Sequence, residues 1–221
     1  MEEKKVIPIK IRAPIRQKKE GVGGLNSILQ DHFCCLIVGK PGSGKSHLLF
    51  ELIMNPSLYF RKFERVLFCT PTKLPLACGT NWKPYLDIPW VLSELAALPK
   101  GSNALVVLDD VIGEIKKEQN NKDLMKLIFN RRHLIPEGTV SILLTSQKYI
   151  VCPTRIRSCL SALILFKLNP SDWKKVKEEC IILDPAQQGI VFKDVYKKPF
   201  TFVYCRLDNG NLYQNFEKQI I

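Results

Sequence analysis

The residues with the clearest chemical potential form a glycine-rich run of eight. The run fits the pattern G-x-x-x-x-G-K-[ST] at every defined position, and its members are Gly39, Lys40, Pro41, Gly42, Ser43, Gly44, Lys45 and Ser46. Glycines let a loop bring its backbone N–H groups close to phosphate oxygens. Lys45 would place a charge between the β- and γ-phosphates, and the Ser46 hydroxyl would coordinate Mg²⁺. The run therefore predicts a binding site for a nucleoside triphosphate and its magnesium ion.

A second candidate for chemistry is an apolar run that closes on two carboxylates. Residues 104–108 are Ala-Leu-Val-Val-Leu, and Asp109 and Asp110 follow directly. In motor ATPases the first acid of such a Walker B element holds the magnesium ion, directly or through its waters, and the second polarises the attacking water. We interpret Asp109 as the metal-binding acid and Asp110 as the general base. The structural alternative is a strand that ends in an aspartate capping the next helix.

A glutamine after the next apolar run is a third candidate. Residues 140–145 form a run of strand length, and Ser146 and Gln147 follow. The strand order of a P-loop sheet would bring this end beside the γ-phosphate. An amide both donates and accepts hydrogen bonds. Gln147 can therefore contact a phosphate oxygen and, at the same time, orient the water that attacks the phosphate. We therefore predict that Gln147 is the sensor of the γ-phosphate.

An adjacent pair of arginines, Arg131 and Arg132, lies between these two runs and precedes His133. An arginine delivered by a neighbouring subunit would stabilise charge in the transition state of phosphoryl transfer. Cationic capping of a helix C-terminus is the competing interpretation. The residue types alone do not favour one of these two interpretations over the other.

The elements that must position these residues follow from hydrophobic periodicity. Strands are expected at about 33–38, 65–70, 104–109, 140–145 and 161–167, and helices after the glycine-rich run and at about 121–131 and 171–180. Near the end, residues 200–207 and 212–216 flank Asp-Asn-Gly-Asn, which predicts a hairpin. This alternation indicates an α/β fold with a mainly parallel central sheet flanked by helices and a C-terminal β-hairpin.

Composition and charge limit the classes of protein to which the chain can belong. A chain of 221 residues with 46% hydrophobic content can bury the core of one domain. No apolar run reaches about 18 residues and the N-terminus is too polar for a signal peptide, so we expect a soluble, intracellular protein without a membrane segment. The eight cysteines show no C-x-x-C spacing and imply no metal site. The net charge of +12 favours a polyanionic partner, with nucleic acid as the leading candidate.

Part of this charge lies in the first 24 residues. We expect residues 1–24 to form a basic N-terminal arm and residues 25–221 to form the P-loop ATPase domain. A Gly-rich break at 21–24 follows the basic residues of the arm, which are Lys4, Lys5, Lys10, Arg12, Arg16, Lys18 and Lys19. Three glutamates dilute this charge, and a solvated tail is the alternative. The lysines at 174, 175 and 177 are interpreted as a solvated helix face.

The motifs together resemble a known family. The combination of GKPGSGKS, LVVLDD, NRRHL, a strand ending in TSQ, and Pro153-Thr154-Arg155-Ile156-Arg157 is similar to the poxvirus-type genome packaging ATPases of large DNA viruses and virophages, in the FtsK–HerA superfamily. The resemblance covers residues 33–168. Many ring ATPases of the superfamily end Walker B with Asp-Glu, whereas this chain has Asp109-Asp110, whose second side chain is one methylene shorter.

The resemblance implies a RecA/FtsK-like P-loop ATPase. Such a protein forms a homo-oligomeric ring, a pentamer or hexamer, and uses ATP and Mg²⁺ to move double-stranded DNA into a preformed capsid. The implied setting is the virion or the viral assembly site in the host cytoplasm, with a capsid or portal protein as a further partner. Arg132 best matches the trans-acting arginine of the family, and Arg131 remains open. Arg157 matches a family position that could support the fold or contact DNA or a neighbouring subunit.

Two other functions stay open at this level. A nucleotide-dependent switch is suggested by Asp110-Val111-Ile112-Gly113, which imitates a D-x-x-G element, but no N-K-x-D base-reading motif follows. A small-molecule kinase would need an acceptor pocket and an arginine-rich lid, which Arg155 and Arg157 imitate. Stimulation of hydrolysis by DNA separates a motor from both.

Overall fold

The structure is a computed structural model that describes residues 29, 32–54, 63–71 and 81–220. The basic N-terminal arm expected at 1–24 lies outside the described residues, as does Cys78. In the described part of the chain, no helix combines the length and the apolar character that crossing a membrane requires.

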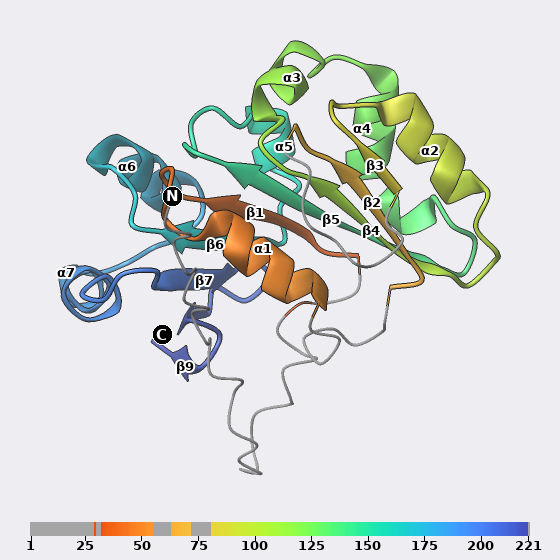
Figure 1. The fold of residues 1–221 in the computed structure, drawn as a ribbon. Helices are drawn as coiled ribbons and strands as arrows, with labels where there is room; N and C mark the ends of the chain where they lie inside the picture. The colour runs from red at the N-terminus through yellow and green to blue at the C-terminus, as the bar shows by residue number, and fades with distance from the viewer. Residues whose placement is uncertain (1–28, 30–31, 55–62, 72–80, 221) are drawn as a thin grey trace, which may run out of the picture.

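One large sheet forms the centre of the molecule (Figure 1). Among the described residues it has nine strands in the order β3-β2-β4-β5-β1-β6-β7-β8-β9. The strands from β3 to β6 in this order run parallel, and β7, β8 and β9 continue the sheet antiparallel. Their bounds are Cys34–Val38 (β1), Arg65–Cys69 (β2), Asn81–Lys83 (β3), Asn103–Leu108 (β4), Thr139–Ser146 (β5), Ala162–Phe166 (β6), Phe202–Arg206 (β7), Leu212–Gln214 (β8) and Lys218–Gln219 (β9).

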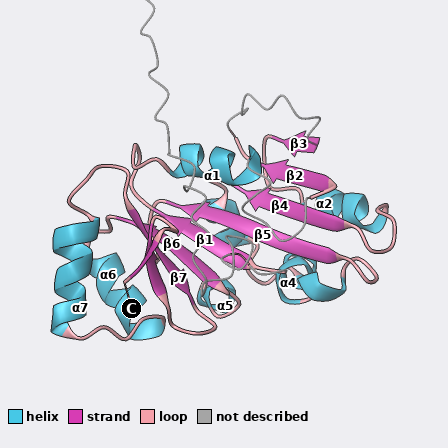
Figure 2. Cartoon of the chain, turned by 90° about the horizontal axis from the view of Figure 1, so that it is seen from below, coloured by secondary structure: helices cyan, strands magenta, loops and turns pink. Residues whose placement is uncertain are grey.

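Helices cover both faces of this sheet (Figure 2). They are α1 (Lys45–Met54), α2 (Ile88–Ala96), α3 (Ile112–Lys117), α4 (Lys122–Phe129), α5 (Thr154–Arg157), α6 (Pro170–Glu179) and α7 (Pro185–Ile190), with a 3₁₀ turn η3 (Arg131–His133) and a π-helical turn η4 (Val191–Val195). Helix α1 packs on one face through Leu48, Leu49 and Leu52. The apolar side chains of α2 to α6 pack on the other face.

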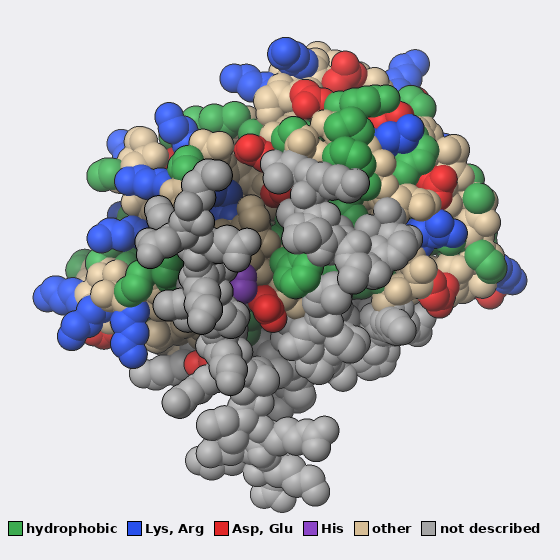
Figure 3. All heavy atoms as spheres, viewed as in Figure 1, with side chains coloured by type: hydrophobic (Ala, Val, Ile, Leu, Met, Phe, Trp, Pro, Cys, Tyr) green, Lys and Arg blue, Asp and Glu red, His purple; other side chains and the backbone are tan. Residues whose placement is uncertain are grey.

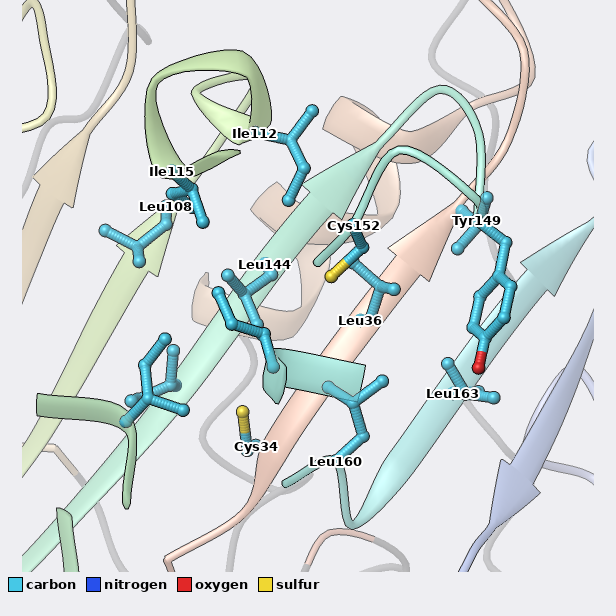
Figure 4. Close-up of a cluster of buried hydrophobic side chains, with 14 of the residues drawn as sticks. Cys34, Leu36, Leu108, Ile112, Ile115, Leu144, Tyr149, Cys152, Leu160 and Leu163 are labelled. Carbon is cyan, nitrogen blue, oxygen red and sulfur yellow. The ribbon is translucent and has the colours of Figure 1, made fainter. Parts of the chain in front are cut away.

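Successive side chains of a strand point to opposite faces of the sheet, so the core is divided into these two layers. In β1, Cys34, Leu36 and Val38 face the layer that contains α2 to α6, and Cys35 and Ile37 face α1. Figure 4 shows part of the first layer, with Leu36 and Leu144 of the sheet and Ile112 of α3 labelled. Because both faces are covered, the central strands are apolar without interruption, as expected for buried parallel strands.

The predicted fold class is confirmed, and the structure adds elements that the periodicity did not reveal. All five predicted strands are present within one or two residues of their expected bounds, and the predicted hairpin forms β7 and β8. The elements that were not predicted are β3, β9, α2, α3, α5, α7 and the turn η4. The helix expected at 121–131 is shorter, because α4 ends at Phe129 and the chain tightens into η3. Its start is fixed by Asn121, whose side chain accepts hydrogen bonds from the backbone N–H groups of Asp123 and Leu124.

Candidate active site

The glycine-rich loop joins the carboxyl end of β1 to the first turn of α1. Gly39 donates its N–H to the carbonyl of Ser146 at 3.1 Å, which ties the loop to the end of β5. A Cβ on Gly39 would lie 2.5 Å from Ser43 Oγ and 2.8 Å from Phe166 Cβ, so a larger residue does not fit there. Gly44 has a φ of +102°, in a region that other residues rarely adopt. The loop therefore closes tightly only with glycine at these two positions.

The ammonium group of Lys45 lies inside this loop. Its Nζ donates hydrogen bonds to the carbonyls of Gly39 at 2.7 Å and Lys40 at 3.1 Å. Burial lowers the pKa of Lys45, and the nearby carboxylates of Asp110 and Asp109 partly oppose this shift. The lysine is thus held between the loop backbone and the two acids, where a phosphate group of a nucleotide would bind.

Asp109 is a buried acid held by two threonines. Only 5% of the residue is exposed. Thr145 donates its hydroxyl to Asp109 Oδ1 at 2.7 Å, and Thr70 donates to Asp109 Oδ2 at 3.1 Å. These threonines lie at the carboxyl ends of β5 and β2, the two strands that flank β4. Each oxygen keeps a further lone pair, so the carboxylate is fixed in orientation and fits the hard oxygen ligand set of Mg²⁺.

Asp110 and Gln147 lie within reach of each other. Asp110 is exposed and has a φ of +54°, and its N–H donates to Thr145 Oγ1 at 2.9 Å. The Gln147 amide Nε2 lies 3.5 Å from Asp110 Oδ1. Thr145 therefore bonds both acids, and the structure brings the loop, Asp109, Asp110 and Gln147 together at the carboxyl ends of β1, β4 and β5. The sequence did not single out Thr70 and Thr145, because a threonine at a strand end is an ordinary feature.

The two adjacent arginines lie away from this cluster and differ sharply in environment. Arg131 is only 6% exposed, and its guanidinium donates to the carbonyls of His32 at 2.6 Å and Ile128 at 2.8 Å. Arg132 is exposed. Because His32 precedes β1, η3 lies at the amino ends of the strands, opposite the glycine-rich loop. The eight residues of β5 span about 26 Å, so neither arginine side chain reaches the glycine-rich loop of the same chain.

Arg157 is an internal anchor. Its guanidinium donates to Glu179 at 2.8 and 2.9 Å and to the carbonyl of Cys152 at 2.6 Å, and it stacks 5.1 Å from the centre of the Tyr149 ring. The side chain is 8% exposed. Of the roles that the sequence left open for Arg157, these contacts show support of the fold. Arg157 holds the segment that follows Gln147 against α6.

Comparisons with known proteins identify the fold of the chain. No protein-family model matches the chain, and no curated protein sequence does either. Among solved structures, the genome packaging NTPase B204 from Sulfolobus turreted icosahedral virus 2, in complex with ATP-gammaS, is similar with a TM-score of 0.64 and 14% identity; the match covers 87% of this chain and 100% of that chain.

Two other solved structures are similar over most of the chain. The cytoplasmic domain of the type VII secretion ATPase EccC from Thermomonospora curvata has a TM-score of 0.51 and 15% identity, over 81% of this chain and 23% of that one. The pCW3 conjugation coupling protein TcpA with ATPgS has a TM-score of 0.53 and 13% identity, over 86% of this chain and 60% of that one. At these identities the likeness shows the fold, and the chain has the mixed α/β fold of the P-loop ATPases.

Proposed function

We propose that this chain is an ATPase that drives double-stranded DNA into a preformed viral capsid. In this proposal it acts as a homo-oligomeric ring, with ATP and Mg²⁺ bound between subunits and a capsid or portal protein as docking partner. The sequence resemblance to poxvirus-type packaging ATPases supports this function, and so does the structural likeness to the packaging NTPase B204.

The proposal rests mainly on where the candidate site residues lie among the residues that the structure describes. Lys45, Asp109, Asp110 and Gln147 meet at one end of the sheet, whereas the exposed Arg132 lies at the other end. In P-loop ATPases an arginine adds to the lysine and Mg²⁺ a further positive charge that stabilises the transition state. A neighbouring subunit that presents its amino-end surface would supply Arg132, so the geometry favours a ring over a monomeric switch or kinase.

In this proposal each residue of the site has its own role in ATP hydrolysis. The backbone of the loop and Lys45 would bind the phosphates, and Ser46 with Asp109 would hold Mg²⁺, which neutralises phosphate charge when bound. Asp110 would accept a proton from the attacking water, and Gln147 would orient that water, because their side chains face the same space 3.5 Å apart. Thr70 and Thr145 would keep the Asp109 side chain correctly directed through their hydrogen bonds.

Charge supports DNA as the substrate that is moved. The chain carries a net charge of +12. Figure 3 shows Lys and Arg side chains gathered over the part of the surface that carries α6 and α7. In this region Lys174 and Lys193 are exposed. Basic side chains that contact phosphates bind DNA without reading its sequence, and they release counterions, so affinity falls steeply with salt.

The test is steady-state ATP hydrolysis with and without long double-stranded DNA, at low and moderate salt. The Lys45→Ala variant is the negative control for hydrolysis, because it removes the ammonium charge that would contact the phosphates. We expect DNA of any sequence to stimulate hydrolysis, and moderate salt to weaken the stimulation. Hydrolysis that is indifferent to DNA, at protein concentrations at which the ring assembles, would refute the motor and favour a switch or a kinase.

A further inference from the structure

A pocket of about 390 Å³ lies directly beside the glycine-rich loop. Its walls are formed by residues 40–43 of the loop, by Phe166 and Lys167 at the end of β6, and by residues 196–201, which lead from η4 into β7. Its volume falls within the range of small-molecule sites. The pocket thus continues the phosphate site toward the antiparallel side of the sheet.

The most unusual residue of this pocket is Phe200. The residue is 51% exposed, although its side chain is a large apolar ring, and its φ is +61°. A phenylalanine in the left-handed region is strained, and such strain persists only where the surrounding structure enforces it. A Cβ placed on Gly44 would lie 3.3 Å from Phe200 Cδ1, so the ring stands against the phosphate loop.

The segments on both sides of Phe200 are held by hydrogen bonds. The Thr201 hydroxyl lies 2.6 Å from the carbonyl of Val195 and 2.8 Å from that of Lys198. Phe202 donates its N–H to Asn215 Oδ1 at 3.0 Å. These bonds fix the backbone around Phe200 in the strained conformation. The fold therefore keeps an exposed aromatic face next to the place where phosphates would bind.

The polar groups of the pocket are of few kinds. The Tyr196 hydroxyl is already donated to the carbonyl of Leu165 at 2.9 Å. The exposed ammonium groups of Lys167, Lys197 and Lys198 can only donate. The Ser43 hydroxyl is buried and has no hydrogen-bond partner within the described residues; a hydroxyl can donate or accept. These groups offer stacking and adaptable hydrogen bonds. Among the described residues that line the pocket, no side chain would accept a hydrogen bond from adenine and at the same time reject guanine.

We infer that this pocket binds the purine base of the nucleotide, that Phe200 stacks on that base, and that the site discriminates little between adenine and guanine. The inference rests on the proposed nucleotide-binding function. Stacking on an aromatic ring tolerates different bases, because every base presents a π-face. GTP is therefore expected to bind nearly as well as ATP, within about tenfold, whereas sites built to read one base reject the other far more strongly.

The test is equilibrium binding of ATP, GTP and inorganic tripolyphosphate to the full chain in Mg²⁺, without turnover. In Phe200→Ala the affinity for both nucleotides should fall about tenfold or more, while the affinity for tripolyphosphate stays unchanged and shows that the phosphate site is folded. Phe200→Trp should retain nucleotide affinity, because it keeps a stacking face. Tyr85→Ala is the matched control, since Tyr85 is equally exposed at 51% and lies outside the pocket.

The outcomes separate this inference from the proposed function. If tripolyphosphate and ATP both bind but Phe200→Ala leaves ATP affinity unchanged, the base does not stack on Phe200 and the inference is overturned. An ATP preference above about tenfold over GTP would overturn the account of weak discrimination. If neither ATP nor tripolyphosphate binds the wild-type chain, the proposed nucleotide-binding function itself fails.

Discussion

Thr145 on β5 donates its hydroxyl to Asp109 on β4 at 2.7 Å. The same oxygen accepts the N–H of Asp110 at 2.9 Å. One hydroxyl on a neighbouring strand therefore fixes the direction of Asp109, the proposed metal-binding acid, and the turn that places Asp110, the proposed general base. Thr145 acts in the proposed reaction as a positioning residue.

Thr145→Val should lower the rate of ATP hydrolysis about 10- to 100-fold and raise the Mg²⁺ concentration needed for half-maximal rate. Valine keeps the shape but leaves the Asp110 N–H without its acceptor, so stability should fall by about 1 to 3 kcal/mol. The measurement is a Mg²⁺ titration of hydrolysis, together with chemical denaturation. Thr145→Ser, which keeps the hydroxyl, should stay close to wild type. An unchanged Mg²⁺ dependence in Thr145→Val would argue against the positioning role.

Arg132→Ala should reduce hydrolysis by about 10³- to 10⁵-fold while nucleotide binding stays nearly intact, because the arginine acts on the transition state. Mixing this variant with Lys45→Ala provides the decisive measurement. In a mixed ring, an Arg132→Ala subunit keeps its own phosphate-binding loop with Lys45. A neighbouring Lys45→Ala subunit can supply the missing Arg132 to that site, so activity should reappear. Lys126→Ala, an exposed change on α4, is the control. Normal turnover by Arg132→Ala alone would refute the assignment.

Arg131→Ala should destabilise the fold, in contrast to the change at its neighbour. Arg131 is buried and donates to two backbone carbonyls, whereas Arg132 is exposed. Charged hydrogen bonds of this kind contribute about 1.5 to 3 kcal/mol, and exposed substitutions usually stay within about 0.5 kcal/mol. Denaturant unfolding of the two variants measures the difference. A stable Arg131→Ala variant that cannot hydrolyse ATP would transfer the trans-acting role to Arg131.

Glu179→Gln should destabilise the protein at neutral pH, and the effect should fade in acid. Burial raises the pKa of Glu179, but the hydrogen bonds from Arg157 and Tyr149 outweigh it, so the net pKa lies below the ordinary range of a glutamate. A lowered pKa means that the stabilisation is present above the ordinary pKa and is lost as pH falls through the folded value. The difference in stability between the two proteins should therefore shrink as the pH falls from about 5 through and below the ordinary pKa range of a glutamate.

The measurement for Glu179 is the melting temperature of wild type and variant across this pH range. Glu178→Gln is the matched control, because Glu178 is its neighbour in α6 and forms only a 3.4 Å contact with Lys175 among the described ion pairs. This control should change the melting temperature little at any pH. A pH-independent difference for Glu179→Gln would mean that its charge does not stabilise the segment after Gln147.

The central strands could be predicted because covering both faces of a parallel sheet makes each buried strand an apolar run. Strand β3 escaped this reasoning, since Asn81-Trp82-Lys83 is short and only half-buried. Helix α2 carried a usable signal that was overlooked: the Asp87 side chain accepts from the N–H of Trp90, and a proline follows in the first turn. An N-capping aspartate directly before apolar residues at helical spacing would have been enough to predict this helix.

The proximity of the loop, both acids and Gln147 could be predicted because each follows an apolar strand, and the carboxyl ends of parallel strands meet at one edge of the sheet. Thr70 and Thr145 could not, because their role depends on β2 and β5 flanking β4, and strand order is not written in local sequence. Arg131 and Arg132 are chemically identical neighbours. Only the packing of η3 against the segment before β1 separates the buried residue from the exposed one.

The sheet ends on both sides in very short strands. In the described part of the chain, β3 has three residues and β9 has two, and each includes a lysine. Short outer strands with charged residues offer a poor template for pairing with the backbone of another chain. Copies of this protein that gather at high local concentration are thereby protected from joining sheet to sheet into aggregates. We therefore expect the proposed ring to be held by side chains of helices and loops rather than by pairing between strands.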